Sequence, residues 1–323
     1  MSVALRQETP PHAPEAGWAR RLLGPFHVTG VFWFRIHRWG VTILPSRAIG
    51  AFIALFTTFF WLALRKIRAA IAANLVPVLG ACGWWQRQRR IYRTFRQFAW
   101  CLSERYERLS TDRAFTVALE GEESWRDLAG AERGFVFVTA HLGNWEMGSM
   151  LPASRDRRRI HVVREAETDP RAQRFIEELI RNRGGDLYTT HFAEDPQLGV
   201  DLLDALRRGE IVALQGDRPR AGGRTAEMTL FGRPFRLPIG PAALARAAGV
   251  PLVPVFVFRE ARLSYRCMVR PPIYVAQSSD RRRDLEAALA RFAVDLEAAI
   301  RRHPHQWFCF RSLWKGGRVV KSR

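Results

Sequence analysis

The chain has 323 residues, of which 47% are hydrophobic and 25% charged, a balance that excludes wholesale disorder and allows one large core. Its formal net charge is +20, and nearly all of the positive charge is arginine, because the only lysines are Lys66, Lys315 and Lys321. Codon bias is one explanation of this charge. We favour the other, which is that the partners are anionic: phospholipid headgroups, phosphorylated glycolipids, an acidic carrier protein or nucleic acid.

The cysteines Cys82, Cys101, Cys267 and Cys309 lie far apart and form no Cys-x-x-Cys pair. This spacing argues against a zinc ribbon, a redox motif or a disulfide framework, and it suits a reducing compartment. The start of the chain lacks the pattern of a signal peptide. Residues 1 to 17 are rich in proline and are predicted to be a disordered tail.

The most apolar stretch covers residues 48 to 64 and carries no charge over about seventeen residues, the lower limit for spanning a bilayer. Arg47 precedes it, Arg65 and Lys66 follow it, and several tryptophans cluster around it. We expect it to be the apolar helix of an N-terminal membrane-anchoring region over residues 18 to 110. Spanning and interfacial placements both remain open, and a buried core helix is the alternative.

Residues 86 to 110 have helical periodicity, with Ile91, Phe95, Phe98 and Leu102 at spacings of three and four. The other face of this predicted helix is strongly basic. Such a helix can lie on an anionic membrane, line a groove for an acyl chain, or simply cover the main core.

After residue 111 predicted strands and helices alternate, which indicates an α/β fold with a mostly parallel or mixed sheet flanked by helices. The segment from Ser264 to Val275 is predicted to be an edge strand, because Pro271 and Pro272 cannot sit in the centre of a sheet. The last long helix is expected over residues 280 to 302. We assign residues 111 to 316 to a catalytic domain and residues 317 to 323 to a basic tail.

The sharpest local motif is TAHLGNWEMG, residues 139 to 148. A predicted strand delivers His141 to its carboxyl end, where open α/β sheets place their ligands. Asn144 is a good N-cap, so Glu146 falls in the first helical turn, and Gly143 permits the backbone to fold back. Glu146 is then able to hold one imidazole nitrogen while the other acts as a general base.

A second motif, IVALQGDRPR, contains another predicted strand. Asp217 and Arg218 follow it, so we expect them at the same rim of the sheet as His141, the edge formed by the carboxyl ends of the strands. Arg218 suits a phosphate or an oxyanion, and Asp217 is expected to hold it in place. Arg164, at the end of another predicted strand, is a further candidate on this rim. For each, a surface residue with a local ion pair is the alternative.

Other chemistries lack their motifs. The chain has no Gly-x-Ser-x-Gly, no His-Glu-x-x-His and no glycine-rich phosphate loop. We therefore expect neither a metal nor another cofactor. A nucleic-acid-binding protein would explain the charge, but no recognisable module interleaves basic and aromatic residues, and the apolar stretch would be unexplained.

Four segments carry a resemblance: TAHLGNWE, QGDRP, TLFGRPFRLPIGPAALARAAGVPLVPVF and HPHQWFCFRSLW. In this order they look like the bacterial late acyltransferases of lipid A biosynthesis, within the lysophospholipid acyltransferase superfamily. Phosphatidylinositol mannoside acyltransferases are related. The match is collinear from about Arg65 to Lys315.

The resemblance implies transfer of a fatty acyl chain from acyl carrier protein, or from acyl-CoA, to a hydroxyl of a membrane glycolipid. A lipid A precursor is the expected acceptor, and a phosphatidylinositol mannoside-type glycolipid is the alternative. It also implies the bacterial inner membrane, with the catalytic domain facing the cytoplasm, and no covalent acyl-enzyme.

The family's His-x4-Asp/Glu motif falls on His141 and Glu146, and its Phe-Gly turn falls on Phe231 and Gly232. We include this turn, Arg164, Asp217, Arg218 and Asn144 among the residues expected to bind substrate. Arg311 stands where many members carry histidine, a departure that bears on the acceptor more than on the chemistry.

Overall fold

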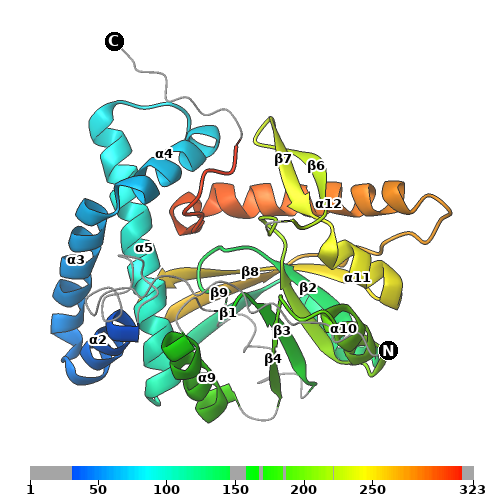
Figure 1. Ribbon diagram of the computed structural model, residues 1–323, viewed down its shortest axis with the longest axis horizontal. Helices are drawn as coiled ribbons and strands as arrows, with labels where there is room; N and C mark the ends of the chain where they lie inside the picture. Colours follow the sequence, from blue (N-terminus) through cyan, green and yellow to red (C-terminus); the bar gives the residue numbers. More distant parts are fainter. Residues whose placement is uncertain (1–30, 146–157, 167–169, 185–186, 221, 315–323) are drawn as a thin grey trace, which may run out of the picture.

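The computed structural model describes residues 31–145, 158–166, 170–184, 187–220 and 222–314 (Figure 1). The predicted disordered tail, the basic tail and Glu146 lie outside these residues. The helices are α2 (Val31–Ile43), α3 (Ser46–Ala63), α4 (Arg65–Leu79), α5 (Trp84–Ser110), α6 (Glu122–Gly130), α9 (Pro170–Gly184), α10 (Leu198–Arg207), α11 (Gly240–Ala248), α12 (Arg281–Arg302) and the 3-10 helix η1 (Pro304–Gln306). The strands are β1 (Thr116–Glu120), β2 (Phe135–Thr139), β3 (Ile160–Arg164), β4 (Tyr188–Phe192), β5 (Ile211–Gln215), β6 (Thr225–Leu230), β7 (Arg233–Pro238), β8 (Leu252–Ala261) and β9 (Ser264–Val269).

Seven strands form one sheet in the order β1-β9-β8-β2-β5-β3-β4. All neighbours in it are parallel except β8 and β9, which are joined by a short turn and pair antiparallel. The predicted α/β fold with a mostly parallel, mixed sheet is confirmed. Strands β6 and β7 form a separate antiparallel hairpin.

The prediction of an edge strand over residues 264 to 275 is wrong. Strand β9 pairs with β1 on one side and with β8 on the other, so it is an inner strand. It ends at Val269, before Pro271 and Pro272, and the prolines therefore take no place in the ladder that would exclude them.

The sheet is buried on both faces, as its apolar strands require. Successive residues of β2 point to opposite faces. Val136 and Val138 pack in a cluster with α10, α11 and α12, while Phe135 and Phe137 pack in a second cluster with Trp125 of α6. Figure 1 shows α12 running along one face of the sheet.

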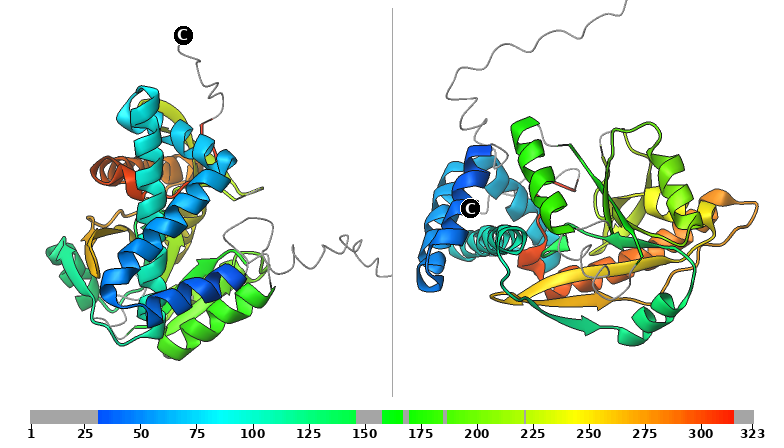
Figure 2. Two further views of the ribbon diagram at one scale, coloured as in Figure 1. Left: turned by 90° about the vertical axis from the view of Figure 1, so that its left-hand side faces the viewer. Right: turned by 90° about the horizontal axis from the view of Figure 1, so that it is seen from below.

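Helices α2 to α5 gather at one end of the sheet (Figures 1 and 2). We call them the helical layer. Helix α5, predicted over residues 86 to 110, is the member that the other helices pack on. The predicted apolar helix over residues 48 to 64 corresponds to α3, which ends at Ala63 because Leu64 leaves the helical conformation.

Helix α4 then continues at an angle of 93° to α3. Within the described residues no single helix is long and apolar enough to cross a membrane, although this bent pair has sufficient length and apolar character when taken together.

Candidate active site

Two neighbouring parallel strands deliver the central residues of the site. Strands β2 and β5 are paired so that Thr139 lies opposite Gln215, the last residue of each strand. His141 and Asp217 each follow two positions later. Because the carboxyl ends of parallel strands meet at one edge of a sheet, the two side chains are brought together there.

His141 Nδ1 lies 2.7 Å from Asp217 Oδ1, a hydrogen-bond distance. Both side chains are buried, Asp217 completely. The bond fixes the proton on Nδ1, so Nε2 is the nitrogen left for a substrate, the arrangement by which a carboxylate orients a histidine base. The sequence predicted that Asp217 would hold Arg218, and the structure instead pairs it with His141.

The turn that carries His141 is held by backbone contacts on two sides. Gly143 donates to the Gln306 carbonyl at 2.8 Å, and Phe308 donates to the His141 carbonyl at 2.7 Å. Gly143 has a φ of 58°, and a Cβ there would lie 1.9 Å from the Val257 carbonyl oxygen, so only glycine fits. The predicted role of Gly143 in folding the backbone back is confirmed.

The C-terminal segment after η1 holds the other oxygen of Asp217. The Trp307 indole N–H donates to Asp217 Oδ2 at 3.1 Å, and the Cys309 thiol lies 3.6 Å from the same oxygen. Asn74 of α4 fixes this segment, because its side-chain amide donates to the Cys309 and Arg311 carbonyls at 2.9 and 2.8 Å. The helical layer thus supports the segment that holds Asp217.

These contacts decide the protonation of the buried acid. Burial alone would raise the pKa of Asp217, but His141, Arg218 and Trp307 outweigh it and hold the pKa well below its ordinary value. Burial, with the nearby Asp217 charge, raises the pKa of the Cys309 thiol well above its usual range. Asp217 is therefore an anion at neutral pH, and Cys309 is a protonated donor to it.

His141 lines two adjoining cavities of about 210 Å³ and about 530 Å³. Both are also lined by Arg164, the last residue of β3, and by Arg218, which follows β5, as predicted for this edge of the sheet. Arg220 and Arg311 line the larger cavity. Several guanidinium groups next to a histidine base suit an anionic substrate or an oxyanion.

Asn144, a predicted substrate-binding residue, lies just after His141 in the same turn. Its side chain is buried and donates to the Cys101 carbonyl of α5 at 3.2 Å and to the Tyr265 hydroxyl at 3.3 Å. It does not line either of the two cavities at His141. The residue holds the turn from behind, and both its contact with substrate and the role of Glu146 stay predictions.

Phe231 and Gly232 form the turn of the β6–β7 hairpin, where both have positive φ, 52° and 69°. The Phe231 N–H donates to Glu297 Oε2 of α12 at 2.6 Å, and its ring packs near Trp307. Neither residue lines the two cavities at His141. The structure therefore gives this pair a role in attaching the hairpin, and their contact with substrate stays a prediction.

Within the described residues, no group of three or more His, Cys, Asp or Glu side chains has the arrangement of a metal site. The arrangement around His141 supplies a base, an orienting carboxylate and arginines, which is sufficient for proton transfer and for stabilising negative charge. The site is thus a histidine hydrogen-bonded to a buried carboxylate, beside arginine side chains, at the carboxyl edge of an α/β sheet.

The chain belongs to the bacterial lipid A biosynthesis acyltransferases, whose family profile matches residues 23–316. It is 30% identical over 183 residues to a phosphatidylinositol mannoside acyltransferase of Mycobacterium tuberculosis, covering 56% of this chain and 54% of that one. The enzyme of that name from Mycolicibacterium smegmatis is 27% identical over 186 residues, covering 57% and 58%. The chain thus spans about half the length of the curated relatives it matches.

A solved structure, the 1-acyl-sn-glycerophosphate (LPA) acyltransferase PlsC from Thermotoga maritima, aligns with 78% of this chain and 98% of its own at 14% identity, with a TM-score of 0.36. The predicted membership of an acyltransferase family is confirmed by the family profile.

Proposed function

We propose that this protein transfers a fatty acyl chain from a thioester to a hydroxyl of a membrane glycolipid. The observation that carries the proposal is the buried pair of His141 and Asp217 on the wall of cavities also lined by Arg164 and Arg218. A thioester carbonyl is already activated. Transfer therefore needs only deprotonation of a hydroxyl and stabilisation of an oxyanion, with no covalent enzyme intermediate.

In this mechanism His141 Nε2 takes the proton of the acceptor hydroxyl while Asp217 stabilises the imidazolium that forms. The alkoxide oxygen bonds to the thioester carbonyl carbon, and the resulting oxyanion is stabilised by a rim guanidinium, for which Arg218 is our candidate. When the carbon–sulfur bond breaks, His141 returns its proton to the departing thiolate. The products are an ester and a thiol, and the enzyme regains its starting protonation.

The site also lies beside a small apolar cavity. Phe310 lines the smaller His141 cavity and a separate apolar cavity of about 50 Å³ inside the helical layer. That second cavity is lined by Phe56, Phe60 and Phe98 among other apolar side chains.

The acyl donor is a thioester of acyl carrier protein or of CoA. Both carriers are anionic and suit the basic surface of this protein.

We further propose that the helical layer lies against the bacterial inner membrane, with the site open to the cytoplasm. Helix α3 is apolar on both faces: Ile49 and Ile53 are buried, while Leu55, Phe59 and Leu62 are exposed. A helix that is hydrophobic all round needs an apolar environment on its outer face as well. Between residues 31 and 103 the sequence contains Arg and Lys but no Asp or Glu, and this positive charge suits anionic headgroups.

The acceptor is a glycolipid, and two classes compete. The family name favours a lipid A precursor, whereas the names of the curated relatives favour a phosphatidylinositol mannoside-type lipid. Both present sugar hydroxyls close to phosphate, so both fit a histidine base beside arginines.

Lipid mass spectrometry tests the proposal. Cells that express the wild-type chain should contain one glycolipid species heavier by an acyl mass than in cells expressing His141→Ala, and its headgroup identifies the acceptor class. Equal amounts of both proteins in the membrane fraction serve as the control. Identical lipid profiles in the two strains, or the heavier species in the His141→Ala strain, would count against acyl transfer by this site.

A further inference from the structure

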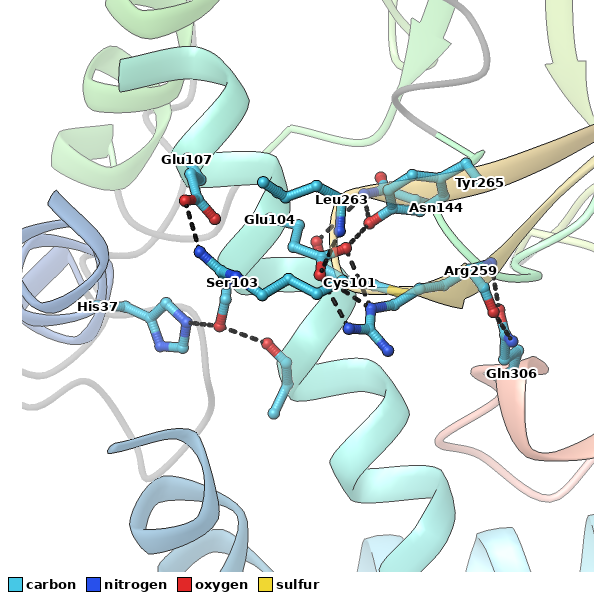
Figure 3. A network of polar contacts seen from close by, with 12 residues as sticks. His37, Cys101, Ser103, Glu104, Glu107, Asn144, Arg259, Leu263, Tyr265 and Gln306 are labelled. Atoms are coloured by element: carbon cyan, nitrogen blue, oxygen red, sulfur yellow. Dashed lines mark hydrogen bonds and ion pairs between the residues drawn. The ribbon is translucent and has the colours of Figure 1, made fainter. Parts of the chain in front are cut away.

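A buried carboxylate of the helical layer lies at the centre of a polar network that reaches Asn144, in the turn that carries His141 (Figure 3). Glu104 of α5 is fully buried. Its two oxygens accept from Arg259 of β8 at 2.9 to 3.0 Å, from the Leu263 N–H at 3.2 Å and from the Tyr265 hydroxyl. Glu104 lines neither of the two cavities at His141.

One branch of this network reaches the turn of His141. The Tyr265 hydroxyl donates to Glu104 and accepts from the Asn144 amide at 3.3 Å. Burial, with the nearby Cys101 and Glu104, raises the pKa of Tyr265, so the hydroxyl stays a donor. Asn144 lies three residues after His141, and its own N–H donates to the Val257 carbonyl at 3.1 Å.

A second branch reaches the segment that holds Asp217. The backbone N–H of Arg259 donates to Gln306 Oε1 at 2.9 Å, and Gln306 Nε2 donates back to the Arg259 carbonyl at 2.7 Å. The Gln306 carbonyl in turn accepts from Gly143, and the next residue, Trp307, donates to Asp217. Figure 3 shows Arg259 between Glu104 and Gln306.

We infer that Glu104 is a positioning residue, which sets the placement of His141 relative to Asp217 through these two branches. The inference rests on the proposed function for its kinetic consequence, although the geometry itself does not depend on the substrate. A buried ion pair contributes little net stability compared with apolar packing, so its value lies in the geometry that it specifies.

Helix α5 supplies a matched control one turn away. Glu107 is also fully buried and also pairs with arginines, Arg113 and Arg262, the latter at 2.9 Å. Neither arginine belongs to the two branches that reach the turn of His141. If Glu104 acted only by stabilising the fold, Glu107→Gln and Glu104→Gln would have the same effects on the site.

The test compares Glu104→Gln, which leaves Arg259 uncompensated as Glu107→Gln leaves its own arginines, with the milder Tyr265→Phe, and circular dichroism checks that each variant is folded. Tyr265→Phe removes a single hydroxyl and cuts the first branch. Long-range ¹H–¹⁵N correlations from the carbon-bound ring protons of His141, assigned with His141→Gln, report which ring nitrogen carries the proton in the unliganded full-length protein. Initial rates with a thioester donor give kcat and KM.

We expect Glu104→Gln and Tyr265→Phe each to shift the ring ¹⁵N signals of His141 and to lower kcat by ~10- to 100-fold with KM unchanged, since small misplacements of catalytic groups have effects of this size. Glu107→Gln should lower thermal stability without either change. Unaltered ring signals in a folded Glu104→Gln, or equal shifts in Glu104→Gln and Glu107→Gln, would overturn the inference. If the ring signals respond as expected but the wild-type protein transfers no acyl group, the proposed function fails and the positioning role stands.

Discussion

At the scale of single residues, two carboxylates are candidates for orienting His141. Asp217 is bonded to its Nδ1 at 2.7 Å, is completely buried and receives two further donors on its other oxygen. Glu146 is the carboxylate of the sequence motif and lies outside the described residues. Because Asp217 is already in place behind the imidazole, we propose that it orients His141, and the catalytic role of Glu146 stays a prediction.

The two variants Asp217→Asn and Glu146→Gln separate these roles. Asp217→Asn keeps the shape of the site but presents an amide to Nδ1, which disfavours the reactive tautomer. We expect kcat to fall by ~10²- to 10⁴-fold. Glu146→Gln should cost less than Asp217→Asn. Steady-state rates of acyl transfer in detergent micelles measure both, with circular dichroism as the folding control. A larger loss for Glu146→Gln would reverse the assignment.

The second prediction for a single residue concerns the role of Arg218 in turnover. It lines both cavities at His141, and its charge lowers the pKa of Asp217. Arg218→Ala should lower kcat by ~10²- to 10³-fold if it stabilises the oxyanion, and this loss should persist in high salt, because a group close to the reacting atoms is poorly screened. The matched control is Arg207→Ala on α10, an exposed arginine paired with Asp204 that should leave kcat unchanged. A rise in KM alone would assign Arg218 to binding instead.

At the scale of elements, the sequence predicted the strand ends that build the site but not how the strands pair. His141, Arg164 and Asp217 each follow an apolar run, and open α/β sheets place functional residues at such ends. The register of β2 with β5 is a long-range property, and it alone brings His141 opposite Asp217. The equal spacing of two residues after each strand was the signal available for this pair.

Two features of the helices could not be predicted from the sequence, because they too depend on contacts between distant segments. Nothing near Leu64 resembles a helix breaker, yet the chain bends by 93° between α3 and α4. Glu104 and Glu107 look like solvated residues of a basic helix, but both are completely buried against arginines of later segments. Partners 155 residues away decide their burial, and helical periodicity contains no information about them.

The helical layer contains a histidine that links its stability to pH. His37 is buried among Phe52, Phe56 and Tyr106, and burial lowers its pKa from 6.5 to about 4. The unfolded chain therefore binds the proton more readily than the folded chain between these two values. Stability from this group is complete above pH 6.5 and is lost as the pH falls toward 4.

The variant His37→Gln should show a flatter dependence. Between pH 7.5 and pH 5 the wild-type chain should lose about 2 kcal/mol more of its free energy of unfolding than the variant, at roughly 1.4 kcal/mol per pH unit below 6.5. Urea unfolding at the two pH values measures the difference. Parallel losses in both proteins would show that His37 is not the group responsible.

At the scale of the whole molecule, apolar exposure and positive charge coincide. The exposed large hydrophobic side chains of the described residues lie mostly in the helical layer: Trp39, Ile43, Leu55, Phe59, Leu62, Val76, Trp84 and Trp85. Basic residues without acidic ones accompany them from residue 31 to residue 103. The α/β sheet at the other end is covered by its own helices. One end of the molecule is therefore suited to a lipid surface. Hydrogen bonds of Asn74 and Glu104 connect that end to the segments that hold His141 and Asp217.

Binding to lipid vesicles tests this polarity of the molecule. The double variant Leu55→Ser with Leu62→Ser removes two side chains that are 70% and 60% exposed on α3. The matched control, Val200→Ser with Val294→Ser, removes two that are 62% and 70% exposed on α10 and α12. Flotation with phosphatidylglycerol vesicles and with phosphatidylcholine vesicles, each at low and high salt, separates the apolar from the electrostatic contribution.

We expect the α3 variant to weaken binding to both kinds of vesicle by at least ~10-fold at either salt concentration, because burying a leucine contributes ~1.5–3 kcal/mol and a factor of ten is ~1.4 kcal/mol. The valine control should bind as the wild type does. Wild-type binding should be tighter to phosphatidylglycerol at low salt, and that preference should fade at high salt, since exposed charges are screened over about 8–10 Å. Equal weakening by both double variants would show that no particular end of the molecule faces the lipid. Binding that ignored salt and lipid charge would remove the basic residues from the docking surface and leave the apolar face of α3 alone.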